Sequence, residues 1–191
     1  MIRCFVLLFL PLSLLGQQEY STNELKNGKC KDDTSFVYTL PFEHKKKVFL
    51  VQGYESMFSH KGEKALDFKV KAGTPVCAAR SGVVIAARKD SDKGGLKPEN
   101  LSDGNYVFIR HDDGTEANYW HFKTGGVVVN IGDSIQQGQL IGYSGNTGYS
   151  AFPHLHFEVR SVGGSQIATR FYTQHGTLYL RPGKFYKTLY R

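Results

Sequence analysis

Short apolar and β-branched runs, separated by Gly, Asp and Asn, are the feature that most limits how this chain can fold. Sustained helical periodicity is absent apart from a weak segment near 23–26, so these runs predict strands. Strands at this spacing, with turn residues between them, indicate an all-β fold, either an antiparallel sandwich or a partly open barrel. The expected strands are 47–51, 65–70, 82–88, 106–110, 116–122, 140–143 and 155–160.

Composition supports one folded domain. A chain of 191 residues has room for one compact core, and its 40% hydrophobic and 13% aromatic content excludes wholesale disorder. The 21 Gly and 11 Tyr favour strands and tight turns and exclude a coiled coil. We expect the domain over 47–161, an N-terminal extension at 17–46, and a basic, aromatic segment at 162–191 packed on the sheet edge. The polar stretch 89–105 predicts a surface loop beside a site.

Residues 1–16 have the pattern of a secretory signal peptide. Arg3 precedes a run of about eleven apolar residues, too short to span a bilayer, and the small residue Gly16 closes it. Cleavage would export the chain to the periplasm or the cell-wall space without a membrane span. It would also lower the net charge from +7 to +6, because Arg3 is the charged residue removed. An uncleaved membrane anchor is the alternative.

Cys30 and Cys77 remain after the leader and Cys4 are removed. An even number of cysteines in an oxidising compartment makes a Cys30–Cys77 disulfide a reasonable hypothesis. The alternative is that Cys77, which lies in an apolar string, is a buried small hydrophobe.

A His-x-His pair lies at the start of the expected strand 155–160, with His154 just before the strand and His156 inside it. His154 and His156 are two residues apart, so both imidazoles point to one face of the sheet, while Leu155 and Phe157 point to the core. Two imidazoles presented together suit a metal site or acid–base chemistry. Taken alone the pair is a weak signal, because surface histidines also produce it.

Two further motifs carry candidate site residues. His60 lies in a Gly-containing stretch, and Asp67 follows it inside an apolar run. A carboxylate there is costly to bury unless it is hydrogen-bonded or holds a cation, although a turn-capping Asp67 beside an exposed His60 is the plain alternative. His121 ends an aromatic-rich strand, where stacking among aromatic rings would equally explain it.

Together these residues resemble the lysostaphin-type zinc metallopeptidases of peptidase family M23, whose pattern is His, Asp, Tyr-x-His and His-x-His. The resemblance covers roughly 53–160 and includes strings similar to the family's turns at 71–76, 81–84, 130–133 and 138–148. One departure is the first motif, where six residues, 61–66, separate His60 from Asp67 instead of the common three. The fold implied is a small, partly open β barrel of the duplicated-hybrid-motif kind.

The resemblance also implies a role for each matched position. His60, Asp67 and His156 would ligate one Zn²⁺, and His121 and His154 would act as catalytic histidines off the metal. Three protein ligands with an open fourth position are typical of a catalytic zinc site. No His-Glu-x-x-His motif is present in the sequence, so a neutral imidazole is the expected proton acceptor.

The implied activity is zinc-dependent hydrolysis of peptide bonds in bacterial peptidoglycan, in a stem-peptide crosslink or in a glycine bridge, with an unidentified protein activator left open. A basic chain suits an anionic wall. The alternatives are a non-catalytic scaffold that activates other wall hydrolases and an amidase using Cys77. Nucleic-acid binding is not expected, because no reader motif is present. We expect the remaining histidines, His44, His111 and His175, to be solvated.

Overall fold

The computed structural model describes residues 36–190, whose regular secondary structure is almost entirely β-strand. The predicted leader at 1–16 and Cys30 lie outside the described residues. Among those described, no helix is long and apolar enough to cross a membrane. The elements are β1 (Val37–Thr39), β2 (Lys47–Gln52), β3 (Ala65–Lys69), β4 (Pro75–Cys77), β5 (Gly82–Arg88), β6 (Gly94–Gly95), the 3₁₀ helix η1 (Pro98–Ser102), β7 (Tyr106–Arg110), β8 (Glu116–Trp120), β9 (Phe122–Val127), β10 (Ser134–Ile135), β11 (Leu140–Ser144), β12 (Gly148–Tyr149), β13 (His154–Arg160), β14 (Gln166–Ile167), β15 (Arg170–Thr173), β16 (Gly176–Leu178) and β17 (Lys184–Lys187).

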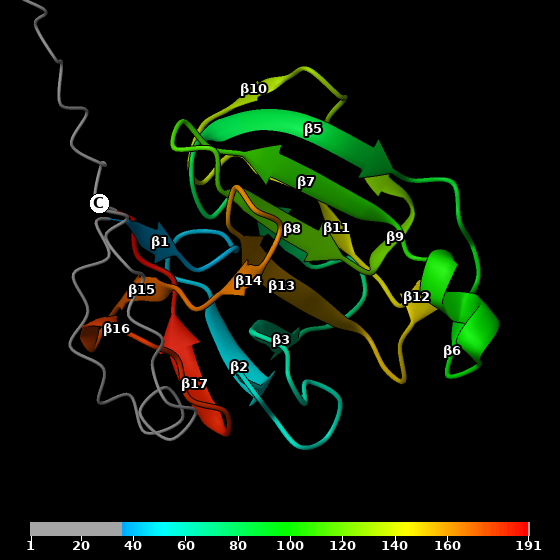
Figure 1. Ribbon diagram of the computed structural model, residues 1–191, viewed down its shortest axis with the longest axis horizontal. Coiled ribbons are helices and arrows are strands. Elements are labelled where there is room, and N and C mark those ends of the chain that lie inside the picture. The colour runs from blue at the N-terminus through cyan, green and yellow to red at the C-terminus, as the bar shows by residue number, and fades with distance from the viewer. Residues whose placement is uncertain (1–35, 191) are drawn as a thin grey trace, which may run out of the picture.

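One large sheet organises the molecule. Its nine strands run in the order β10-β5-β7-β8-β13-β3-β2-β17, with β14 paired to β13 (Figure 1). Three small sheets accompany it, in the orders β4-β11-β9, β1-β15-β16 and β12-β6. The pairs β1–β15 and β12–β6 are parallel, and the other strand pairs are antiparallel. The all-β prediction is confirmed, and the sheets do not close into a barrel.

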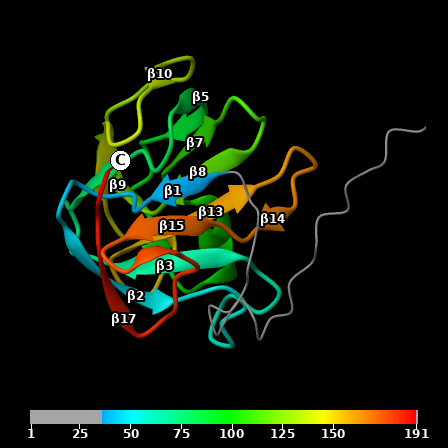
Figure 2. The same cartoon turned by 90° about the vertical axis from the view of Figure 1, so that its left-hand side faces the viewer.

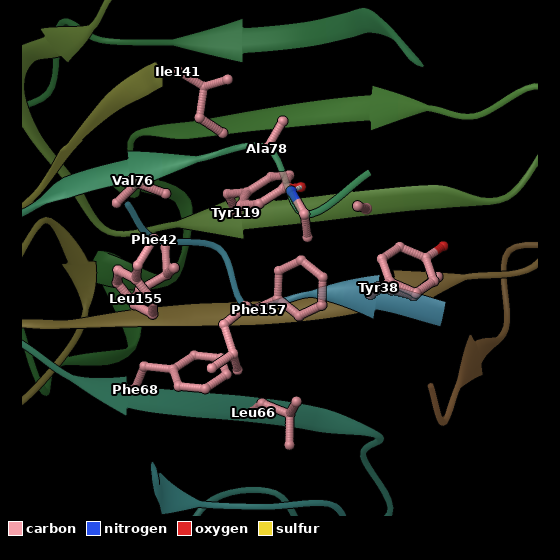
Figure 3. Packing of buried hydrophobic residues seen from close by; sticks show 14 of the residues in the cluster. Tyr38, Phe42, Leu66, Phe68, Val76, Ala78, Tyr119, Ile141, Leu155 and Phe157 are labelled. Atoms are coloured by element: carbon pink, nitrogen blue, oxygen red, sulfur yellow. Dashed lines mark hydrogen bonds between the residues drawn. The ribbon is translucent and has the colours of Figure 1, made fainter. Parts of the chain in front are cut away.

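The core lies on the inner face of the large sheet. In β13 the alternate residues Leu155 and Phe157 are buried, and they meet Leu66 and Phe68 from the adjacent β3 (Figure 3). The ring of Phe157 packs edge-on against that of Tyr119, with centroids 5.1 Å apart. Because side chains alternate along a strand, this arrangement places His154 and His156 on the opposite, outer face.

The core begins N-terminal to Lys47, the residue at which we place the start of the peptidase domain. Leu40 and Phe42, which follow β1, are fully buried in the same hydrophobic cluster. The C-terminal segment joins two sheets, since β15 pairs with β1 and β17 pairs with β2 at the edge of the large sheet (Figure 2).

The longer predicted strands agree with the structure to within a residue or two at their ends, with one exception. The predicted strand 116–122 is wrong as a single element, because β8 ends at Trp120 and β9 starts at Phe122. His121 between them has a left-handed backbone with φ of +68°. Its carbonyl accepts a hydrogen bond from the amide of Gly145 at 2.7 Å. The turn is therefore stabilised by a contact with a residue distant in sequence.

Gly82 gives a direct test of the packing between β5 and β7. An added Cβ would lie 2.3 Å from the Arg110 carbonyl oxygen and 2.8 Å from Cγ2 of Ile109, so the two strands would have to separate. We expect Gly82→Ala to lower the free energy of unfolding by about 1–3 kcal/mol, measured by urea denaturation. In the control Gly163→Ala the nearest atom is Ser161 Oγ at 3.9 Å, and the change should stay within about 0.5 kcal/mol. Equal losses in the two variants would contradict this account.

Candidate functional site

The register of three strands brings the predicted site residues together on the outer face of the large sheet. His156 in β13 is directly opposite Asp67 in β3 on one side and Trp120 in β8 on the other. Directly opposed residues in an antiparallel sheet share a face, so all three side chains emerge on the same side. His60 comes from the loop between β2 and β3, and His121 follows the end of β8.

His60, Asp67 and His156 form a compact group. The His60 Nε2 atom lies 3.2 Å from Asp67 Oδ2, and His156 Nδ1 lies 2.9 Å from Asp67 Oδ1. These potential ligand atoms all lie within 4.8 Å of one another. His60 and Asp67 are buried, and His156 is partly open. The group therefore has the composition and spacing of a metal site with one accessible side.

Polar neighbours hold the first two members of this group in place. Gln52 donates from Nε2 to Asp67 Oδ2 at 2.7 Å and to Ser59 Oγ at 2.8 Å. The His60 Nδ1 atom lies 3.3 Å from the carbonyl oxygen of Gly53. Because a carbonyl only accepts, this contact keeps a proton on Nδ1, so Nε2, which faces Asp67, is the nitrogen that could ligate a metal.

His121 and His154 lie beside this group, with ring centroids 4.5 Å apart. Each ring also has its Nδ1 atom against a backbone carbonyl, 2.6 Å from that of Thr147 for His121 and 2.8 Å from that of Phe152 for His154. The Ser150 hydroxyl lies 3.2 Å from the same nitrogen of His154. Both rings thus keep their Nε2 atoms as proton acceptors, and the His154 Nε2 atom lies 3.6 Å from Asp67 Oδ1.

The pKa values of the site depend on burial and on Asp67. Burial alone would raise the pKa of Asp67, but hydrogen bonds from His156 and His60 outweigh it and hold that pKa well below its usual range. For His60, burial lowers the pKa, but the hydrogen bond and charge of Asp67, the Gly53 carbonyl and the charge of Glu63 together outweigh it, so the pKa is raised. Burial lowers the pKa of His121 to about 3, and the charges of His154 and His156 act in the same direction. Burial also lowers the pKa of His154, and Asp67 opposes this only in part.

Because their pKa values are lowered, His121 and His154 are neutral at pH 7. A neutral imidazole with an available Nε2 can accept a proton and later return it, which is the property that hydrolytic chemistry requires.

These side chains line a cleft of about 520 Å³. Its walls are largely apolar and include Phe58, Leu96, Leu101, Trp120 and Phe152. Leu96 and Leu101 belong to the stretch 89–105, which borders the site as predicted and contains η1. The only carboxylates among the described residues that line the cleft are Asp67 and Glu63.

His111 corrects one sequence-based expectation. We expected it to be solvated, but it is 4% exposed, its Nδ1 atom lies 2.8 Å from the Ser81 carbonyl oxygen, and its ring packs edge-on against Tyr38. The polar sequence around it gives no sign of this cover. His44 and His175 are exposed, as expected.

Cys77 is buried, and burial raises the pKa of its thiol to about 11. A nucleophilic cysteine needs a lowered pKa, so the amidase alternative has no support from the structure. The disulfide with Cys30 stays a prediction, because Cys30 lies outside the described residues.

Gln52 is the site neighbour that sequence analysis missed. It is opposite Asp67 only because the pairing of β2 with β3 shifts between Leu50 and Gln52. A glutamine at the end of an expected strand carries no signal of such a shift.

Two similar proteins each match about half of the chain. Over 93 residues the chain is 39% identical to lysostaphin of Staphylococcus simulans. This alignment covers 49% of this chain and 17% of lysostaphin. Over 98 residues it is 38% identical to the peptidoglycan DD-endopeptidase ShyC of Vibrio cholerae, covering 51% of this chain and 20% of ShyC. The chain thus spans about a fifth of the length of these relatives.

The fold is similar to the crystal structure of a zinc containing peptidase from Vibrio cholerae, with a TM-score of 0.51 and 25% identity. That alignment covers 68% of this chain and 38% of the other. The family model described as peptidase family M23 matches residues 61–168, more than half of the chain. The chain therefore belongs to peptidase family M23, a family of metallopeptidases.

Proposed function

We propose that this chain is an exported, zinc-dependent endopeptidase that hydrolyses peptide bonds in bacterial peptidoglycan. The observation that carries the proposal is the convergence of His60, Asp67 and His156 with two more histidines in the wall of one cleft. Export rests on the leader pattern at 1–16. The division into a leader at 1–16, an extension at 17–46, a peptidase domain at 47–161 and a C-terminal segment at 162–191 is part of the same proposal.

The donor set fits zinc. Two imidazole nitrogens and one carboxylate oxygen are ligands that zinc prefers, and ligand atoms around a tetrahedral zinc stand about 3.3 Å apart. The contacts from Asp67 to His156 and to His60, at 2.9 and 3.2 Å, are close to that spacing. The fit supports His60, Asp67 and His156 as the ligands. When bound, zinc with an open fourth position would lower the pKa of a coordinated water and polarise a substrate carbonyl.

His121 and His154 supply the proton chemistry in this proposal. Both are neutral, both have the proton on Nδ1, and both therefore present an Nε2 atom that can accept a proton from water. Once protonated, either ring can donate to the leaving amine or stabilise the negative charge that develops on the carbonyl oxygen. The two rings lie close enough to share this work, and we assign it to them jointly.

The proposed substrate rests on the similar proteins and on the net charge of the chain. Lysostaphin and a peptidoglycan DD-endopeptidase are among the similar proteins, and a chain of net charge +7 suits an anionic wall. The aromatic and aliphatic walls of the cleft suit the backbone and methyl groups of a peptide.

The test is a digestion of purified peptidoglycan by residues 17–191, with and without a zinc chelator. Chromatography and mass spectrometry of the products should show defined muropeptides, and the chelator should prevent their release. The masses also identify the bond that is cut. No release from protein that contains one equivalent of zinc would contradict the proposal and favour a non-catalytic scaffold.

A further inference from the structure

A row of directly opposed residues crosses four neighbouring strands and ends at the candidate site. Phe185 in β17 is opposite Phe49 in β2, Phe49 is opposite Lys69 in β3, and Lys69 is opposite His154 in β13 (Figure 1). Opposed residues share a face, so this row lies on the same outer face as the site. Phe185 is 54% exposed, and Lys69 is also exposed.

Aromatic rings hold two lysines of this face in position. The Lys69 Nζ atom lies 5.8 Å from the ring centroid of Phe152, which lines the cleft and lies 5.2 Å from the His154 ring. The Lys47 Nζ atom lies 4.9 Å from the ring centroid of Phe185. A cation–π contact orients an ammonium group without neutralising its charge.

Neither of these lysines forms an ion pair within the part of the chain that the structure describes. Of the two carboxylates that line the cleft, Asp67 is bonded to Gln52, His60 and His156, and Glu63 belongs to the loop that carries His60. The Lys69 ammonium therefore lies beside Phe152 of the cleft wall, with no ion pair among the described residues to neutralise it.

We infer that the outer face of β3, β2 and β17 extends the cleft as a binding surface for a peptide with free carboxylates, with Lys69 as the specificity-determining contact. Opposed side chains have Cβ atoms about 4.5–5.5 Å apart, so the Lys69 ammonium can reach a carboxylate one or two residues from a peptide bond held at His154. The exposed ring of Phe185 and the half-buried ring of Phe49 would cover the apolar part of such a peptide. This inference rests on the proposed function and favours an acidic stem peptide over a neutral glycine bridge.

The experiment measures binding, so that it is independent of catalysis. The probes are two synthetic crosslinked stem-peptide dimers whose scissile amide is replaced by an uncleavable ketomethylene group, one with free carboxylates and one with all carboxylates amidated. Calorimetry on residues 17–191 with one equivalent of zinc added should give about tenfold tighter binding of the free-carboxylate dimer, and added salt should reduce that difference.

Lys69→Met should abolish the preference, and Lys69→Arg should keep it. Lys184→Met is the matched control, because Lys184 is exposed and is opposite the buried Leu50, which places it on the other face of the sheet. Unchanged thermal unfolding would show that each variant is folded.

Equal affinity of the wild-type protein for both dimers, or a preference retained by Lys69→Met, would overturn the inference. Preferential binding without cleavage of the natural dimer would support the Lys69 inference while contradicting the proposed hydrolase.

Discussion

Replacement of His154 by Ala is expected to reduce peptidoglycan hydrolysis by about 10²–10⁴-fold while zinc stays bound, because we propose that this side chain moves the proton and does not hold the metal. The distances are compatible with this division: His154 Nε2 lies 3.6 Å from Asp67 Oδ1, whereas His156 Nδ1 lies 2.9 Å from the same oxygen and His60 Nε2 lies 3.2 Å from Asp67 Oδ2. Since His121, His154 and His156 also lie close enough together to hold a metal ion, the zinc content of the variant decides between the two groups. The measurements are the rate of muropeptide release and the zinc content of the purified variant.

His156→Ala is the matched comparison for that variant. It removes a proposed ligand two residues away on the same face of β13, so both zinc and activity should be lost. Loss of zinc from His154→Ala, or a full zinc content in His156→Ala, would show that the ligand assignment is wrong.

Phe157→Ala is expected to produce the largest loss of stability, about 3–5 kcal/mol in the free energy of unfolding. Phe157 is 1% exposed, and its ring meets those of Tyr119, Phe171 and Tyr38 at centroid distances of 5.1, 5.9 and 6.4 Å. Truncation would leave a cavity between rings that belong to three different strands, β8, β15 and β1. Urea denaturation measures the effect, and the melting temperature should fall by roughly 6–20 °C.

The same substitution at Phe58, which is 91% exposed, is the control. Phe58→Ala should change the free energy of unfolding by no more than about 0.5 kcal/mol. A loss below about 1 kcal/mol for Phe157→Ala would mean that this aromatic cluster does not stabilise the core as described.

Much of the large sheet could be predicted, because its long strands have clear patterns. β5 and β7 form uninterrupted apolar or β-branched runs, and β13 alternates between core residues and histidines. β6 and β12 have two residues each and contain three glycines between them, so no local pattern marks them. The break between β8 and β9 at His121 depends on the amide of Gly145, which no local pattern can supply.

The candidate site was also predictable only in part: its residues could be predicted, but the contacts that hold them could not. The order and flanks of the five residues pointed to a metal site through the family resemblance, and the structure brings the five together. The contacts that hold these residues could not be predicted from the sequence, because they depend on strand register and on backbone carbonyls. Gln52 meets Asp67 through a shift in strand pairing, and the Thr147 carbonyl fixes the proton of His121 from a loop far along the chain. His111 shows the converse, since Tyr38 and the Ser81 carbonyl cover a histidine with a polar sequence context.

A zinc titration of metal-free protein tests the central proposal most directly. The chain would be stripped with a chelator, dialysed, and returned to activity by stepwise addition of zinc, with muropeptide release measured at each step. The proposal predicts that activity rises in proportion to added zinc and stops rising at one equivalent per chain. Full activity in the metal-free protein, or no activity after one equivalent of zinc has bound, would contradict it.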